Sequence, residues 1–144
     1  MTRVVISSDH ADIPLRQAIV AHVEAAGHTV TDIGPATDAS TDYPKHGQAA
    51  AQMIADGDAD LGIIICGTRQ GIMMAANKAA GTRRGVCSDT FSARMIRAHN
   101  NAPILSIGPP VSGHAPAPQT VDPSLVTGFQ GGPHASALAP IEAA

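Results

Sequence analysis

A cysteine followed directly by a glycine-bounded turn has the clearest chemical potential in this sequence. Cys66 precedes residues 67–71 (Gly-Thr-Arg-Gln-Gly), and a helical pattern begins directly after them. Backbone N–H groups at a helix start lack partners and carry partial positive charge, so this turn can hold an anion and favour the Cys66 thiolate. A thiolate beside such an anion hole suits nucleophilic attack or removal of a proton next to a carbonyl. The turn lacks the residues of a nucleotide-binding loop, so nucleotide binding is not indicated.

Two further pairs of polar residues lie at the ends of predicted elements. Asp9 and His10 follow the first predicted strand, whereas His99 and Asn100 end the fourth predicted helix. Ligands of parallel α/β sheets bind beyond the carboxyl ends of the strands, which groups Asp9 and His10 with Cys66. His99 joins them only if a second subunit supplies it or the helix end folds over.

Each of these residues also has a purely structural interpretation. Cys66 could be an inert core residue that closes a buried strand, and Gly67 and Gly71 could be ordinary turn residues. His99 could be favoured by the helix dipole, and Asp9 could act only as a helix cap. Spacing alone leaves both interpretations open.

The elements that must position these residues follow from the hydrophobic pattern. We predict five strands, at residues 3–7, 28–33, 61–66, 82–87 and 103–107, and the clearest is 61–66, which has no alternation with polar residues. Helical patterns occupy the intervals, at residues 13–26, 43–56, 72–79 and 89–99, the last with Phe91, Met95 and Ala98 inward. This order predicts an α/β fold, a Rossmann-like three-layer α/β/α sandwich with a five-stranded parallel sheet.

Composition excludes several classes of protein. The 144 residues fit one domain, residues 1–144, and the 44% apolar residues allow a core. A net charge of -3, nine scattered Lys and Arg residues and 2% aromatic residues argue against nucleic-acid binding. No apolar run reaches the roughly 18–20 residues of a membrane span, and two cysteines are too few for a disulfide scaffold. We therefore expect a cytoplasmic protein without a nucleic-acid or membrane partner.

The C-terminal part differs in composition from the rest. Seven of the eleven prolines lie in residues 109–144. Because Pro116, Pro118 and Pro123 should interrupt a helix, we expect an irregular Pro-rich tail after a core of residues 1–108. This tail should be extended or partly disordered, and should cross to the dimer partner where it is ordered.

Several segments together resemble one family, ribose-5-phosphate isomerase type B with the related galactose-6-phosphate isomerase subunits. The matching segments are residues 8–11 (Ser-Asp-His-Ala), 41–44 (Thr-Asp-Tyr-Pro), 64–68 (Ile-Ile-Cys-Gly-Thr), 71, 75–78 (Ala-Ala-Asn-Lys), 93–95 (Ala-Arg-Met) and 99–100 (His-Asn). They follow the family's order and spacing over residues 4 to about 108. The resemblance implies the same Rossmann-like sandwich and a homodimer or a tetramer, with sites built from two subunits.

The resemblance also implies a reaction and a role for each matching residue. The family interconverts an aldose and a ketose through a cis-enediolate, without a metal or cofactor. The resemblance implies four catalytic residues in this chain: Cys66 as the base, Thr68 assisting it, His99 for ring opening and Asp9 at the ring oxygen. The residues expected to contact the sugar or sugar phosphate are His10, Tyr43, Gly67, Arg69, Gly71 and Asn100.

Three departures from the family pattern concern the phosphate group. Arg69 replaces the middle glycine of the family's turn, and residues 108–111 (Gly-Pro-Pro-Val) lack the family's arginine. Residues 131–134 read Gly-Gly-Pro-His, and Ala137 stands where a second arginine would follow. Losing bidentate arginines should cost several kcal/mol of phosphate binding, unless Arg69 compensates from another direction.

Our leading hypothesis is therefore an aldose–ketose isomerase that resembles ribose-5-phosphate isomerase B. One alternative is a divergent isomerase for a free or otherwise anionic sugar. Another is a non-catalytic sugar-binding subunit that keeps the fold, although such a subunit has no need of a thiol base.

Overall fold

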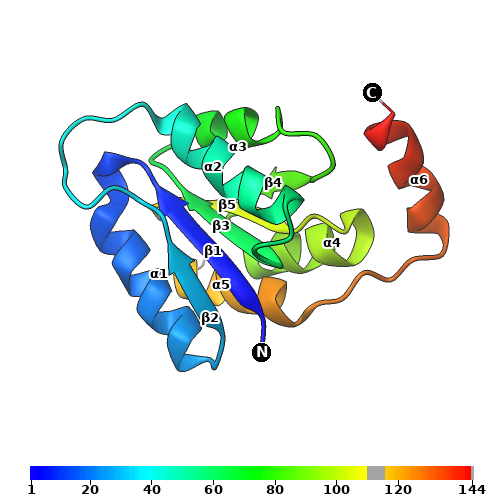
Figure 1. Cartoon of the computed structure of the whole chain (residues 1–144). Coiled ribbons are helices and arrows are strands. Elements are labelled where there is room, and N and C mark those ends of the chain that lie inside the picture. Colours follow the sequence, from blue (N-terminus) through cyan, green and yellow to red (C-terminus); the bar gives the residue numbers. More distant parts are fainter. Residues whose placement is uncertain (110–115, 144) are drawn as a thin grey trace.

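The computed structural model describes residues 1–109 and 116–143, and Figure 1 shows how their elements are arranged. The strands are β1 (Arg3–Ser8), β2 (Thr29–Asp32), β3 (Leu61–Ile65), β4 (Arg84–Val86) and β5 (Ile104–Ile107). The helices are the short 3-10 helix η1 (His10–Asp12), α1 (Ile13–Ala25), α2 (Tyr43–Ala55), α3 (Gln70–Ala76), α4 (Thr90–Asn100), α5 (Ala117–Val126) and α6 (Pro133–Glu142).

The strands form one parallel sheet in the order β2-β1-β3-β5-β4, which confirms the predicted five-stranded sheet. Strand β3 lies at its centre, and all five of its residues are buried. The register pairs Ser8 at the end of β1 with Ile65 at the end of β3. The residues that follow these two strands therefore meet at the carboxyl edge of the sheet.

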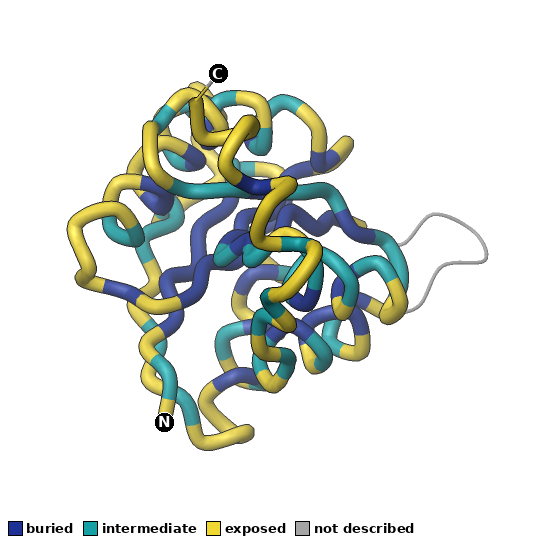
Figure 2. The backbone as a smooth tube through the Cα atoms, turned by 90° about the vertical axis from the view of Figure 1, so that its right-hand side faces the viewer, coloured by how far each residue is buried: buried dark blue, intermediate teal, exposed yellow. Residues whose placement is uncertain are grey.

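Helices cover both faces of the sheet, as the predicted three-layer sandwich requires (Figure 1). Val4 and Ile6 of β1 pack on the face covered by α1, α4 and α5, whereas Val5 packs on the face covered by α2 and α3. This alternation follows from the two-residue period of a strand, and Figure 2 shows the buried strands between exposed outer segments. The core is almost entirely aliphatic.

Of the three residues of α4 predicted to face inward, Ala98 is buried and Met95 is partly buried. Phe91 is 71% exposed, so the prediction that it faces the core is wrong. Ala93 and Ala98 make the buried face of α4. Phe91 precedes Ala93 by two residues, which is about half a helical turn, and therefore lies on the opposite side of α4.

The prediction of an irregular tail is wrong for the described part of the C-terminal segment, which forms α5 and α6. Pro118 lies in the first turn of α5, where its missing N–H would have no partner anyway. Pro123 does lie inside the helix, but Thr120, Val121 and Ser124 are buried by packing on the rest of the chain. Burial thus outweighs the cost of the proline. Residues 110–115 lie outside the described residues, so the prediction is not addressed there.

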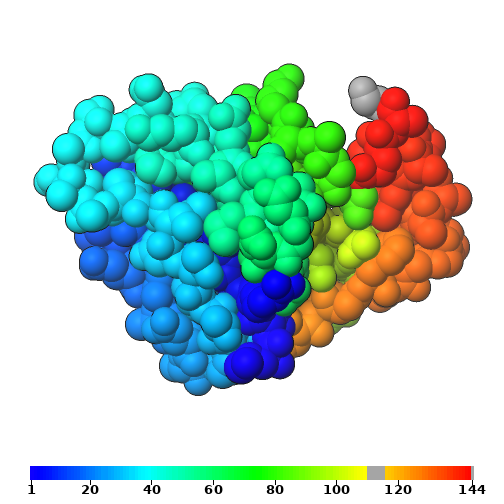
Figure 3. All heavy atoms as spheres, viewed as in Figure 1, coloured from blue at the N-terminus to red at the C-terminus, as the bar shows by residue number. Residues whose placement is uncertain are grey.

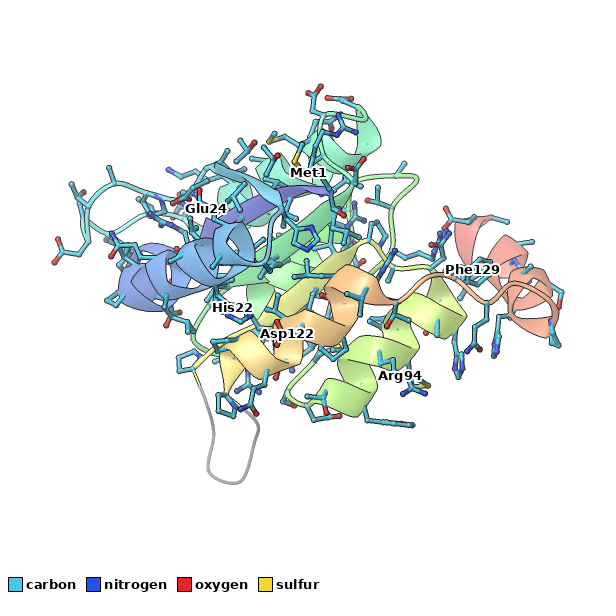
Figure 4. All side chains as sticks on the ribbon, turned by 90° about the horizontal axis from the view of Figure 1, so that it is seen from below. Met1, His22, Glu24, Arg94, Asp122 and Phe129 are labelled. Carbon is cyan, nitrogen blue, oxygen red and sulfur yellow. The ribbon has the colours of Figure 1, made fainter. Side chains whose placement is uncertain are left out.

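Helix α5 is connected to α1 by a side-chain contact between a histidine and an aspartate. Nε2 of His22 on α1 lies 2.5 Å from Oδ1 of Asp122 on α5, and Figure 4 shows the two side chains facing each other. Helix α5 therefore packs on its own chain, and the prediction that the tail crosses to a dimer partner stays a prediction.

Helix α6 lies away from the sheet, at the edge of the molecule (Figure 1). The backbone N–H of Gln130 in the preceding segment donates to the Ala98 carbonyl oxygen of α4 at 2.9 Å. Arg83 forms an ion pair with Glu142 at the end of α6. These contacts connect both ends of α6 with the body of the chain. Among the described residues, no helix combines the length and apolarity needed to cross a membrane.

Candidate active site

A pocket of about 360 Å³ opens at the carboxyl edge of the sheet. The residues that line it are Asp9, Ala11, Tyr43, Cys66, Gly67, Thr68 and Gly71. The structure thus brings together six of the ten residues that the sequence analysis selected. The remaining four are His10, Arg69, His99 and Asn100, none of which lines this pocket.

Cys66 is held at the end of β3 by hydrogen bonds to the neighbouring strand. Its backbone N–H donates to the Ile107 carbonyl oxygen of β5 at 3.3 Å, and the residue is 5% exposed. In the turn that follows, the N–H of Arg69 donates back to the Cys66 carbonyl oxygen at 3.0 Å. This bond occupies one of the N–H groups of the predicted anion hole.

Arg69 adopts an unusual backbone conformation for a side chain of its size. Its φ is 66°, in the left-handed region that favours glycine, and it is buried at 8% exposure. Ser106 Oγ donates to its carbonyl oxygen at 2.7 Å, and its Nη2 donates to the Pro109 carbonyl oxygen at 2.6 Å. The guanidinium is therefore directed at the segment after β5 and away from the pocket.

Asp9 lies beside Cys66 because β1 and β3 are neighbours. Its backbone N–H donates to the Ile65 carbonyl oxygen at 3.2 Å, and its carboxylate caps η1 by accepting from the Ala11 N–H at 3.0 Å. Burial and the nearby Asp9 charge raise the pKa of Asp12, whose Oδ2 is buried without a hydrogen-bond partner among the described residues. Nothing in the spacing of Asp12 along the sequence indicates this burial.

Two histidines lie beside this group and contact Thr41. Nδ1 of His10 accepts from the Thr41 backbone N–H at 3.2 Å, and Nε2 of His46 lies 3.0 Å from Thr41 Oγ1. Burial and Lys45 lower the pKa of His46. His10 thus connects the loop before α2 with the residues that follow β1, and His46 connects the same loop with α2. Nothing in the sequence pattern indicates that His46 lies in this group.

Tyr43 lies directly over the start of α3. A Cβ at Gly71 would lie 2.6 Å from Cε2 of the Tyr43 ring, so only glycine permits this approach. Tyr43 is still 44% exposed, which leaves part of the ring open to the pocket that it lines.

His99 and Asn100 lie at the opposite edge of the sheet. They end α4, which precedes the amino end of β5, whereas the pocket is at the carboxyl ends of β1 and β3. The His99 ring stacks on His134 of α6, with the ring centroids 4.0 Å apart. One copy of the chain therefore does not place His99 or Asn100 beside Cys66.

Comparison with known proteins shows which family this fold and sequence match. The family model described as Ribose/Galactose Isomerase matches residues 4–141. The chain belongs to this family. It is 40% identical over 134 residues to ribose-5-phosphate isomerase B of Escherichia coli strain K12, covering 93% of this chain and 90% of that protein.

Solved structures of ribose/galactose isomerases also match the fold. The structure of Clostridium thermocellum ribose-5-phosphate isomerase B aligns with a TM-score of 0.93 at 40% identity, covering 98% of this chain and 95% of that one. The type B enzyme of Trypanosoma brucei aligns with a TM-score of 0.93 at 36% identity, covering 99% of both chains. As a member of this family, the chain is an enzyme, an aldose–ketose isomerase. Within residues 1–109 and 116–143, no three His, Cys, Asp or Glu side chains gather closely enough to hold a metal ion.

Proposed function

We propose that this isomerase interconverts the aldose and ketose forms of a five-carbon sugar phosphate through a cis-enediolate, with Cys66 as the base. The observation that carries the proposal is the pocket itself, which Cys66, Asp9 and Tyr43 line together. A thiol, a carboxylate and a phenol around one opening suit proton transfer on a polyhydroxylated carbonyl compound. The relatives named above are ribose-5-phosphate isomerases, which supports a pentose phosphate as the substrate.

The proposed reaction moves one proton between adjacent carbons. The Cys66 thiolate removes the proton from C2 of the open-chain aldose, and the electron pair of that C–H bond moves onto the carbonyl oxygen at C1. The proton then returns from Cys66 to C1, while the proton of the O2 hydroxyl passes to the negative oxygen at C1, which leaves a hydroxyl at C1 and the ketose carbonyl at C2. The base must reach two neighbouring carbons, which one sulfur atom can do.

The negative oxygen of the enediolate needs hydrogen-bond donors. We assign this role to backbone N–H groups of residues 67–71, except that of Arg69, which is bonded to the Cys66 carbonyl oxygen. Donors of this kind contribute on the order of 3 kcal/mol each to an oxyanion transition state. Thr68 lines the pocket beside Cys66 and is placed to assist the thiol.

Ring opening requires an acid and a base near neutral pH, and we assign it to Asp9 together with His99 of a second copy. His99 and Asn100 lie at the far edge of their own sheet, so they can reach a Cys66 pocket only across an interface. The proposal therefore includes a homodimer whose two sites each combine residues of both subunits. A histidine side chain can both donate and accept the proton of the ring hydroxyl.

Replacement of each cysteine separately tests the assignment of Cys66. Cys66→Ala should lower kcat for the isomerisation of ribose 5-phosphate by about 10³-fold or more, because the base is lost. Cys87→Ala is the matched control, because Cys87 is equally buried but lies in the core, where burial raises the pKa of its thiol to about 12. Full activity of Cys66→Ala would overturn the assignment, as would absence of turnover in the wild type.

The same assay with ribose in place of ribose 5-phosphate tests whether the enzyme prefers a phosphorylated substrate. Pro133 and Ala137, which replace the family's arginines, both lie exposed on α6. A higher kcat/KM for ribose 5-phosphate than for ribose would support the proposed substrate, and the reverse would favour an isomerase of free sugars. We also propose that the enzyme acts in the cytoplasm, where Cys66, a free cysteine in this structure, stays reduced.

A further inference from the structure

A second cavity, of about 720 Å³, lies at the opposite edge of the sheet from the Cys66 pocket. Its wall includes Thr82, Arg83, Arg84, Asn100 and Glu142. The register pairs Arg84 with Ile104, the first residues of β4 and β5, which places the cavity at the amino edge. Figure 3 shows a recess between the green segment around residue 80 and the red helix α6.

Arg84 in this wall is a buried cation that forms no ion pair with any described residue. It is 7% exposed, and its Nη1 donates to the carbonyl oxygens of Ala79 and Thr82, at 2.9 and 2.5 Å. Its Nε and Nη2 are buried and have no hydrogen-bond partner among residues 1–109 and 116–143, and the same is true of Thr82 Oγ1. Two neighbouring residues of the wall thus carry three buried polar atoms that can donate to oxygen but have no acceptor.

The charges around the cavity do not compensate that of Arg84. Glu142 is the only acidic residue among the described residues of the wall, and it is already paired with Arg83. Arg97 lies behind the wall, where its Nη1 donates to the Ala102 carbonyl oxygen and its Nε has no partner. Burial lowers the pKa of Arg84 to about 10, because Glu142 offsets only part of the cost of burying the charge. The side chain still remains charged at neutral pH.

Leaving a buried guanidinium with unused donors costs free energy, which a bound anion would recover. An oxyanion matches the requirement, because the planar guanidinium presents parallel N–H groups to two oxygens of one phosphate or carboxylate. The size of the cavity exceeds that of a single phosphate and leaves room for the remainder of a small metabolite.

We propose that this cavity is an oxyanion site, which binds a phosphate group through Arg84 and Thr82. Two molecules could provide this phosphate group: free inorganic phosphate or the phosphorylated sugar substrate. The phosphate of the substrate is a candidate because Asn100 lies in the cavity wall. Asn100 is also expected to contact the substrate in the Cys66 pocket of a second copy of the chain. The binding itself does not depend on the proposed isomerase reaction, since it can be measured on Arg84 directly.

The direct test follows the ¹⁵N-labelled arginine side chains of the wild-type protein by NMR while inorganic phosphate is added. The Arg84 Nε–H signal should shift saturably with phosphate and should not respond to chloride at equal ionic strength. If the chemical shift of the Arg84 Nε–H signal does not change when phosphate is added, the proposal is overturned. This measurement requires no variant and therefore does not depend on whether a substitution folds.

Calorimetry with variants tests which arginine is responsible. Arg84→Gln should weaken phosphate binding at least tenfold, because the bidentate contact is lost. Arg94→Gln is the matched control, since Arg94 lies exposed on the outside of α4 and outside the cavity wall (Figure 4). Equal weakening by both substitutions would indicate a general charge effect and would contradict a site at Arg84.

Kinetics then separate the two sources of phosphate. If the site holds the phosphate of the substrate, Arg84→Gln raises KM for ribose 5-phosphate at least tenfold and leaves kcat/KM for ribose unchanged. If the site holds free phosphate, KM is unchanged, and phosphate still shifts the Arg84 signal at saturating substrate. Both outcomes support the oxyanion site. Failure of the proposed isomerase reaction would remove only this kinetic comparison.

Discussion

Among single residues, Asp12 is the carboxyl group whose ionisation opposes folding most clearly. It is buried, its Oδ2 has no hydrogen-bond partner in the part of the chain that the structure describes, and burial together with Asp9 raises its pKa. A carboxyl group with a raised pKa in the folded state holds its proton more tightly there than in the unfolded chain. Stability is therefore lost as the pH rises from the unfolded pKa through the raised folded pKa.

The substitution Asp12→Asn should remove this pH-dependent loss. We expect the variant to be more stable than the wild type at pH 7, by about 1 kcal/mol, and the gain to shrink as the pH falls towards 4. Thermal unfolding of both proteins between pH 4 and 8 measures it. Asp38→Asn, at an exposed position, serves as the control without such a gain. A constant difference across the pH range would contradict ionisation of Asp12 as the cause.

The individual site residues differ in how far the sequence could predict them. Asp9 and Cys66 were predictable neighbours, because each directly follows a strand and parallel strands end at one edge of the sheet. The burial of Arg84 was not predictable, since it depends on the turn at Ala79 and Thr82 and on the distant helix α6. The direction of the Arg69 side chain likewise depends on the Pro109 carbonyl oxygen, 40 residues away.

At the scale of elements, the close packing of α2 on α3 positions the turn of residues 67–71. A Cβ at Gly47 of α2 would lie 2.4 Å from the Ile72 carbonyl oxygen of α3, which is backbone and cannot rotate away. Helix α3 begins at the end of the turn that follows Cys66. Any residue larger than glycine at position 47 must therefore move α3 and the turn with it.

We predict that Gly47→Ala destabilises the protein by about 1–3 kcal/mol, the usual cost of overpacking, and lowers kcat as well. Chemical denaturation and the isomerase assay measure the two effects. Gln48→Ala, one residue further at an exposed position of the same helix, should change neither. Wild-type stability of Gly47→Ala would show that the two helices separate easily and would contradict the argument.

Elements were predicted well where a local pattern determines them and poorly where packing does. All five strands were predicted, most clearly β3, whose continuous apolar run reflects the burial of all five of its residues. Helix α5 was missed because the rule that excludes proline from helices is local, whereas the burial of Val121 against the rest of the chain is not. Phe91 was misplaced for a related reason, since small alanines form the buried face of α4.

At the scale of the whole molecule, the predicted site residues divide into two groups at opposite edges of one sheet. Cys66 and Asp9 line a pocket at the carboxyl edge, while His99 and Asn100 lie at the amino edge beside α6. A catalytic site that needs both groups requires two copies of the chain. In a symmetric dimer, each copy then provides one half of both sites.

This arrangement predicts that two inactive variants restore activity when they share a dimer. Cys66→Ala and His99→Gln should each be nearly inactive alone. In a mixed dimer, one site carries both substitutions and the other carries none. With equal co-expression and random pairing, half of the dimers are mixed, so the activity should be about a quarter of that of the wild type. If the mixture is no more active than the two variants measured separately, Cys66 and His99 act within one chain or His99 takes no part in the reaction.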